Sequence, residues 1–224
     1  MNPQVELKSD TSNALQSLVF AAKLCYGQEQ DFIDEEAQVK LIKKILAARH
    51  FSILEHAVLS IYITGVSRNF THQLVRHRHM SFAQQSFHYT IAENAALPLL
   101  KESTPLQLSI MEKAYINAFK MYEILMAEGM TRDEARHVLP SGITTKIICT
   151  ANLREWVHFA SIRSCEVNCL EIKTVAYKVQ DILANAFPWL TSYVGPTCWV
   201  EGKCYEGKKS CGHPWQKLES PNGN

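Results

Sequence analysis

The chain has 224 residues, of which 46% are hydrophobic and 20% are charged, and its formal net charge is +1. This length and composition fit one globular domain with a sizeable core, or two small domains. A nearly neutral chain has no general attraction to nucleic acid, so any phosphate must be bound by a local cluster of cations. The first residues are polar and no apolar run is long enough to span a membrane, so we expect neither a signal peptide nor a membrane partner.

The first part of the chain predicts two helices followed by a strand. Apolar residues recur at helical spacing over residues 12–27 and 34–49, which is typical of core helices. Residues 50–55 then form a connector. Residues 56–65 alternate between a more apolar and a less apolar face, as in a half-buried strand.

A short helix is predicted next, over residues 67–77, because Ser67 is a suitable N-cap. Such a helix would place Gln73 and His77 four residues apart on one face. Residues 86–90 have the character of a short strand or an extended arm.

The rest of the chain is mainly helical in pattern. Residues 91–104 are a surface connection, and residues 105–129 are a helix. A capping box predicts a new helix over residues 131–140, and the β-branched run over residues 141–150 predicts a second extended piece. Residues 152–187 are one long helix or two consecutive ones. Together these elements predict an α/β (α+β) fold with a small mixed or antiparallel sheet flanked by long helices.

The stretch over residues 76–89 is rich in groups that bind ligands. It contains two arginines, three histidines, two serines, two glutamines and a tyrosine. Arginine offers a planar fork of donors to phosphate or carboxylate. Phe82, Phe87 and Tyr89 are interleaved with the polar groups, as in a pocket that holds a flat ligand. The alternative is a solvated polar loop.

Arg163 falls on an apolar side of its predicted helix. The residues that share this side are Trp156, Phe159, Ala160 and Val167. A buried arginine is costly unless it meets an anion or a dense set of hydrogen-bond partners. Arg163 therefore marks either an anion site or a structural salt bridge to Glu166 or Glu171.

Residues 76–89 resemble the signature of flavin-dependent thymidylate synthases, which is RHR, two further residues, a serine and then N-E-x-S-x-R-Y. The matching positions are Arg76, His77, Arg78, Ser81, Ser86 and Tyr89. Further matches follow in the same order: His50 to His56, Arg136 to Pro140, Asn152 to Arg154, Arg163, and Glu171-Ile172. The resemblance covers roughly residues 50–175, and several motifs in the right order make it specific.

The resemblance implies a fold, an assembly and a reaction. It implies one domain over residues 1–224, with residues 195–224 as a tail, and a homotetramer whose active sites form between subunits. It implies that dUMP is converted to dTMP in the cytoplasm. Methylenetetrahydrofolate would supply the carbon and FAD the hydride, and NADPH would reduce the flavin.

The resemblance also assigns residues. The flavin contacts would be Ser52, Arg76, His77, Arg78, Gln84, Asn152, Leu153, Arg154 and His158, with His50 near the flavin and the folate entrance. The nucleotide contacts would be Gln73, Leu74, Val75, Arg76, Gln84, Gln85, Ser86, Phe87, His88, Arg136 and Arg163. Arg163 matches the arginine that activates dUMP, since a fixed cation beside N3 favours its ionisation and makes C5 more nucleophilic. His50 as a plain helix-terminal residue is the alternative for that position.

Several positions depart from the family pattern. His88 replaces an arginine and so lacks a permanent charge, and Val167 and Cys169 replace a histidine and a glutamine. Gln84 replaces a carboxylate, and Ala83 also departs from the commonest form. UMP or another pyrimidine nucleotide as substrate, or an inactive nucleotide-binding relative, are therefore the alternatives.

Two other mechanisms are disfavoured by absent motifs. No cysteine has the Pro-Cys-His context of the other class of thymidylate synthase, and we interpret Ser86 as a binding group because no base is assured beside it. No G-x-G-x-x-G occurs, so dinucleotide binding by a Rossmann fold is not expected.

The seven cysteines are scattered and odd in number, which fits reduced thiols in the cytoplasm. Cys198, Cys204, Cys211 and His213 in the tail are a chemically competent zinc set. Their spacing lacks the C-x-x-C pair of most structural zinc sites. We therefore expect a basic surface tail without metal, with the zinc site as the alternative.

Overall fold

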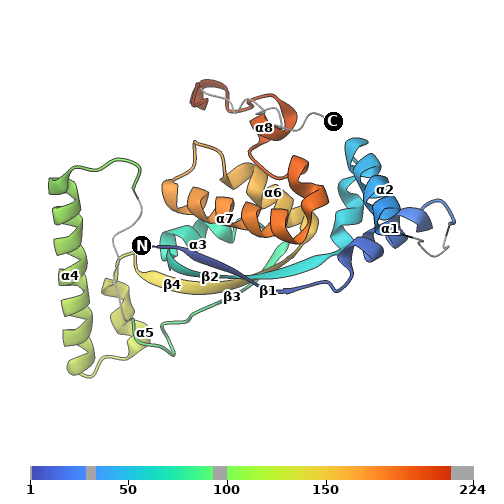
Figure 1. Cartoon of the computed structure of the whole chain (residues 1–224). Helices are drawn as coiled ribbons and strands as arrows, with labels where there is room; N and C mark the ends of the chain where they lie inside the picture. The colour runs from blue at the N-terminus through green and yellow to red at the C-terminus, as the bar shows by residue number, and fades with distance from the viewer. Residues whose placement is uncertain (1, 29–33, 93–99, 213–224) are drawn as a thin grey trace.

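One four-stranded sheet lies at the centre of the molecule, in a computed structural model that describes residues 2–28, 34–92 and 100–212 (Figure 1). The strands are β1 (Gln4–Asp10), β2 (Val58–Ser67), β3 (Met80–Gln84) and β4 (Thr144–Asn152). Their order is β1-β2-β4-β3, and every neighbouring pair is antiparallel. The prediction of a mixed α/β fold with a small antiparallel sheet is confirmed.

The sheet buries one face because its two central strands alternate. Leu59, Ile61 and Ile63 of β2 have no exposed surface, and Ile147 and Cys149 of β4 are almost completely buried beside them. Helices cover this face, and the same apolar cluster contains residues from five of them (Figure 1). These are α1 (Ala14–Leu24), α2 (Glu35–Ala47), α3 (Arg68–Leu74), α6 (Leu153–Arg163) and α7 (Leu170–Ala186).

Helix starts follow the capping residues in the sequence. Asp34 caps α2, and Ser67 caps α3 (Arg68–Leu74) by accepting a hydrogen bond from the Phe70 amide at 3.0 Å. Complete capping boxes open α4 (Pro105–Ala127) at Thr104 and α5 (Arg132–Ala135) at Thr131. A side-chain oxygen that satisfies a free amide of the first turn fixes where each helix begins.

Helix α4 stands away from the sheet and packs with α5 (Figure 1). A second, small apolar cluster joins Tyr122 of α4 and Ala135 of α5 to Phe87 and Ala92, which precede the helices, and to Ile143, which precedes β4. Much of α4 remains uncovered, and its exposed apolar side chains are Leu106, Ile110, Ile116, Met121 and Ile124.

Shorter elements complete the described chain. They are the 3-10 turns Phe51–His56, Arg136–Val138, Pro188–Tyr193 and Gly207–Lys209, and the helix α8 (Thr197–Glu201). Among the described residues, no helix combines the length and the apolar character that crossing a membrane requires.

Three local predictions were wrong. The helix predicted to reach residue 77 ends at Leu74, so Gln73 and His77 do not share a helical face. Residues 86–90 form a turn, and the strand is β3, immediately before it. Strand β1 was not predicted, because an edge strand with much of its surface exposed carries a weak apolar alternation. Residues 152–187 form two helices, which was one of the two alternatives.

Candidate active site

The RHR triplet lies on the turn that follows α3. The amide of Arg76 donates to the Gln73 carbonyl at 3.3 Å, and the amide of His77 donates to the Leu74 carbonyl at 3.0 Å. This tight turn directs His77 inward, where it is 5% exposed, and leaves Arg76 and Arg78 on the surface. Among the described residues, the side chains of both arginines form no hydrogen bond or ion pair.

His77 is held between a carboxylate and a guanidinium. Its Nδ1 is 3.1 Å from Glu155 Oε1, and its Nε2 accepts a hydrogen bond of 3.0 Å from Arg163 Nε. Arg163 also donates from Nη2 to the Gln73 carbonyl at 3.2 Å. We call Gln73, His77, Glu155 and Arg163 the His77 group.

The contacts of the His77 group determine its protonation. Arginine has no lone pair to offer and stays protonated in proteins, so His77 Nε2 must accept and its proton must lie on Nδ1, facing Glu155. Burial is the main cause that lowers the pKa of His77. The hydrogen bond to Glu155 opposes this effect, and the charge of Arg163 adds to it. A neutral imidazole thus holds the arginine without compensating its charge.

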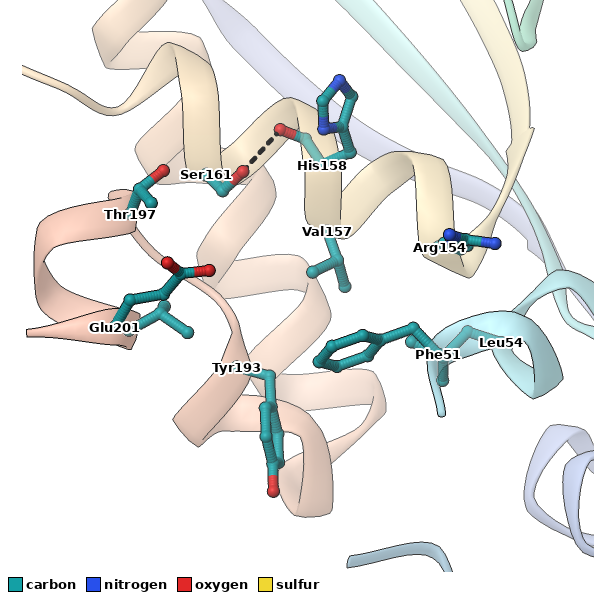
Figure 2. Close-up of a pocket in the computed structure, with 10 residues that line it drawn as sticks. Phe51, Leu54, Arg154, Val157, His158, Ser161, Tyr193, Thr197 and Glu201 are labelled. Carbon is teal, nitrogen blue, oxygen red and sulfur yellow. Dashed lines mark hydrogen bonds between the residues drawn. The ribbon is translucent and has the colours of Figure 1, made fainter. Parts of the chain in front are cut away.

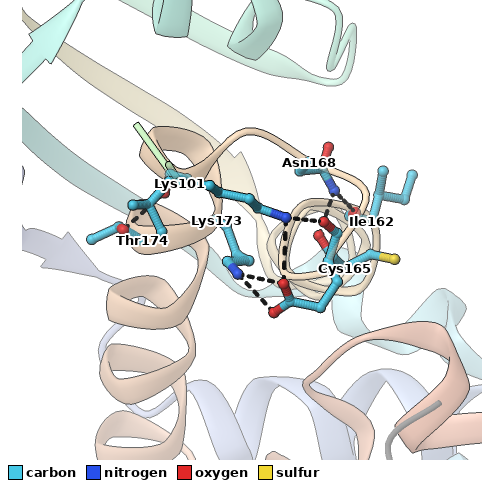
Figure 3. Close-up of polar contacts among 8 residues, drawn as sticks. Lys101, Ile162, Cys165, Asn168, Lys173 and Thr174 are labelled. Atoms are coloured by element: carbon cyan, nitrogen blue, oxygen red, sulfur yellow. Dashed lines mark hydrogen bonds and ion pairs between the residues drawn. The ribbon is translucent and has the colours of Figure 1, made fainter. Parts of the chain in front are cut away.

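Arg163 does not form the salt bridge considered above. Glu166 instead binds Lys173, with both carboxylate oxygens 2.7 Å from Nζ, and it also pairs with Lys101 (Figure 3). Glu171 accepts hydrogen bonds from the amide and the hydroxyl of Ser67. Within the described chain no carboxylate pairs with Arg163, and burial lowers its pKa, so an anion at this position would be stabilised.

A cavity of about 400 Å³ opens beside the His77 group. Its lining residues are Glu55, His79, Asn152, Arg154, Glu155 and His158. The start of α6 positions three of these side chains, because Asn152 caps the helix by accepting from the Glu155 amide at 2.9 Å. Arg154 pairs with Glu55 at 2.6 Å, an exposed contact that a ligand anion can replace.

A second cavity of about 210 Å³ shares Arg154 and His158 with the first (Figure 2). Its walls come from the turn before β2, from α6, and from the segment through α8. They are mainly apolar and aromatic: Phe51, Leu54, Val157, Tyr193 and Val200, with Ser161, Thr197 and Glu201 as polar neighbours. A polar cavity that includes an arginine, beside an apolar one, suits a ligand with a phosphate and a flat ring.

A second cationic group lies between the turn after β3 and α5. His88 Nδ1 and Arg136 Nη2 are 3.3 Å and 2.6 Å from the same oxygen, Oδ1 of Asp133. Burial lowers the pKa of Arg68 of α3, and the nearby charge of Arg136 lowers it further. We call Arg68, His88, Asp133 and Arg136 the Asp133 group.

The turn after β3 is attached to α3 and β4. Arg68 donates to the Gln85 carbonyl at 3.0 Å, and its guanidinium lies over the Phe87 ring, 4.6 Å from the centroid. The side chain of Gln84 donates to Thr71 and Thr145. Helix α3 therefore contacts both groups, although among the described residues no hydrogen bond or ion pair joins them directly.

Comparisons with known protein sequences now bear on this site. The family model described as thymidylate synthase complementing protein matches residues 6–189. A flavin-dependent thymidylate synthase of Geobacter sulfurreducens is 32% identical over 218 residues, which is 93% of this chain and 94% of the relative. The chain belongs to this family.

Other members of the family are similar over comparable lengths. The flavin-dependent thymidylate synthase of Sulfurisphaera tokodaii is 34% identical over 208 residues, covering 87% of this chain and 78% of the relative. That of Thermococcus onnurineus is 33% identical over 222 residues, covering 92% and 90%. The resemblance inferred from the motifs is confirmed.

The structure places the family's motif residues in different surroundings. The side chains of Leu74 and Leu153 are completely buried in the core, so any ligand contact at these positions would be made by their backbone. Val75, His50 and Ser52 are exposed, the last two at the turn that lines the apolar cavity.

Two important side chains were not predicted. Glu155 is 7% exposed and contacts His77, the histidine of the RHR triplet. Asp133 pairs with Arg136 and His88 in its own group. The sequence could have indicated Glu155, because it is a carboxylate next to Arg154 of the family motif and lies in the first turn of a predicted helix. Asp133 was hidden in a capping box, which accounts for acidic residues without any site.

A metal ion does not fit the His77 group. His77, Glu155 and His158 have ligand atoms within 4.8 Å of one another. However, both ring nitrogens of His77 are engaged by Glu155 and Arg163, and a dication would lie against a guanidinium. Of the four tail residues considered as an alternative zinc set, His213 lies outside the described residues.

Proposed function

We propose that this chain is a flavin-dependent thymidylate synthase that converts dUMP to dTMP, with methylenetetrahydrofolate as the carbon donor and NADPH as the reductant of FAD. The observation that carries the proposal is the position of Arg163. It is half-buried, lacks a carboxylate partner in the described chain, and is held by a neutral histidine in a member of this family.

The residues around the two cavities suit FAD. Arg154 and Asn152 provide polar groups for its phosphates or ring edges, and Phe51 and Tyr193 provide flat apolar walls. Bound FAD would supply the hydride. Ser52, His158 and the exposed Arg76 and Arg78 are further contacts in this proposal. His77 and Leu153 would act by positioning, through the buried imidazole and the backbone respectively.

The proposed role of Arg163 is to activate the pyrimidine. Its described contacts use Nε and Nη2, which fixes the plane of the guanidinium. A fixed cation beside N3 of dUMP lowers the pKa of that nitrogen, and the resulting charge makes C5 a better nucleophile. Gln73 would contribute by holding both Arg163 and the uracil.

The Asp133 group is the proposed site of the nucleotide phosphate. His88 and Arg136 converge on one carboxylate oxygen, which a phosphate oxygen can replace with a gain in charge. Gln84 is the last residue of β3, and Gln85, Ser86 and Phe87 follow it into the turn that carries His88. Leu74 and Val75 would contribute through the backbone at the end of α3.

We propose that the two groups form one active site in a homotetramer, in which copies of the chain bring the His77 group of one to the Asp133 group of another. The exposed Arg76 and Arg78 and the exposed apolar side chains of α4 support this assembly. Residues 1–224 would form one domain, with residues 195–224 as its tail, and the protein would act in the cytoplasm.

Release of tritium from labelled nucleotides tests the function. The purified protein is reconstituted with FAD and given methylenetetrahydrofolate, NADPH and either 5-tritiated dUMP or 5-tritiated UMP. We expect release from dUMP only, with dTMP as the product by mass spectrometry. Release from UMP alone would establish the alternative substrate. No release from either nucleotide, in protein that binds FAD, would indicate an inactive relative.

A further inference from the structure

The C-terminal segment returns to the loop between α6 and α7. Helix α8 packs against α6, and Thr197 of α8 lines the same cavity as Ser161 of α6 (Figure 2). Cys198 directly follows Thr197, and Cys165 lies four residues after Ser161. Helix α6 ends at Arg163, so Cys165 lies just beyond the end of α6 that carries Ser161 and faces α8.

Two more thiols follow in the same segment. Cys204 Sγ is 3.6 Å from Ser210 Oγ, across the 3-10 turn Gly207–Lys209. Cys211 is the next residue, and the amide of Gly212 also donates to Ser210 Oγ at 3.3 Å. The turn therefore places Cys204 and Cys211 at its two ends.

The loop that carries Cys165 is held firmly in place (Figure 3). Asn168 Nδ2 donates to the carbonyls of Ile162 at 2.8 Å and of Cys165 at 3.2 Å. Lys101 Nζ also donates to the Glu166 carbonyl. Cys165 is thus presented from a fixed backbone, which is what a ligand in a structural metal site needs.

Groups of the C-terminal segment lie close to Cys165. Burial is the main cause that raises the pKa of the Cys165 thiol, and the nearby charges of Glu206, Cys198 and Cys211 also raise it. Two further cysteines are therefore neighbours of Cys165, and a dication bound among them would deprotonate the thiols that hold it.

We propose that Cys165, Cys198, Cys204 and Cys211 bind one zinc ion in a tetrahedral site. Four thiolates are a common ligand set of structural zinc. In the described chain, none of these sulfurs belongs to a set with ligand atoms within 4.8 Å of one another, so the ion would draw the segment inward to zinc–sulfur distances of about 2.3 Å.

The site would have a structural consequence for the cavity next to it. Thr197, Val200 and Glu201 of α8 form one wall of the apolar cavity, and α8 has only five residues. So short a helix has little stability of its own. Zinc would fix α8 against α6 and hold that wall in place.

Zinc content is the direct test. The full chain is purified in reducing buffer without chelator, and metal is measured by plasma mass spectrometry in the wild type, Cys198→Ser and Cys211→Ser. Cys25→Ser, on an exposed residue just after α1, is the matched control. We expect about one zinc per chain in the wild type and in the control, and at least a fivefold loss in the other two variants.

Two further results keep the proposal falsifiable if a variant folds poorly. Titration of the wild-type thiols with a mercurial should release zinc, which a colorimetric dye detects. We expect one zinc ion to be released for every four thiols that react. A strong chelator should make the wild-type segment after residue 195 sensitive to protease while the core stays intact. Three results would overturn the proposal. The first is a wild type that holds no zinc after incubation with excess zinc, and the second is full zinc content in folded Cys198→Ser. The third is the presence of disulfides between these cysteines in the isolated protein.

Discussion

Removal of the carboxylate behind His77 is the most informative perturbation of the site. Glu155 and His77 are both buried and lie 3.1 Å apart. Glu155→Ala leaves the Nδ1–H of His77 without its acceptor in a place that water reaches poorly. Glu155→Gln keeps the shape and offers an amide oxygen to the same proton, but it removes the negative charge.

The structure sets the expected magnitudes. An unsatisfied buried donor costs about 1–3 kcal/mol, so Glu155→Ala should lose this much free energy of unfolding. At about 2–4 °C per kcal/mol for a chain of this size, Tm should fall by about 2–12 °C. Glu155→Gln should remain within about 1 kcal/mol of the wild type, because its hydrogen bond is retained.

The effect on catalysis should exceed the effect on stability. His77 connects Glu155 to Arg163, and a misplacement of a reacting group by 1 Å costs roughly 100-fold in rate. We therefore expect kcat to fall about 100-fold in Glu155→Ala and about tenfold in Glu155→Gln, with a smaller change in KM for dUMP. Thermal melts and steady-state rates of the FAD-reconstituted variants are the assays. Wild-type Tm and kcat in Glu155→Ala would refute the positioning role.

Three other predictions concern the same cations. Arg163→Ala should lower kcat at least 100-fold while unfolding within about 2 kcal/mol of the wild type, and full activity would remove Arg163 from the mechanism. His88→Arg should lower the Kd for dUMP about tenfold, because arginine carries a permanent charge and offers two donors to the phosphate; calorimetry showing an unchanged Kd would mean that His88 does not touch the phosphate. Since burial lowers the pKa of His77, the unfolded chain binds its proton first as pH falls below about 6.5, so stability should decline from there until the folded pKa is passed. Urea midpoints from pH 8 to 5.5 should decline less in His77→Asn, and an equal decline would contradict this.

The sequence predicted the parts of the fold that depend on local rules. Ser67 and the capping box at Thr131 located two helix starts, since each satisfies amides a few residues away. The alternation in β2 predicted its buried face. Strand β3 was missed because it carries part of the polar signature, and its strand character comes from pairing with β4 some 65 residues later.

The site shows the same division between local and distant causes. The unusual side of α6 on which Arg163 lies was visible in the sequence, because that is a matter of helical period. Its partner was not, since His77 comes from a turn 86 positions earlier and the candidates nearby, Glu166 and Glu171, are used elsewhere. Which cations face one another is decided by the packing of α6 and α3 over the sheet.

The flavin absorbance of the FAD-reconstituted protein, recorded before and after dUMP is added, tests directly whether Arg163 brings the nucleotide to the flavin. We expect a bound flavin whose spectrum changes with dUMP in the wild type, with the change abolished in Arg163→Ala. A protein that binds no FAD, or a spectrum that dUMP changes equally in both proteins, would contradict it.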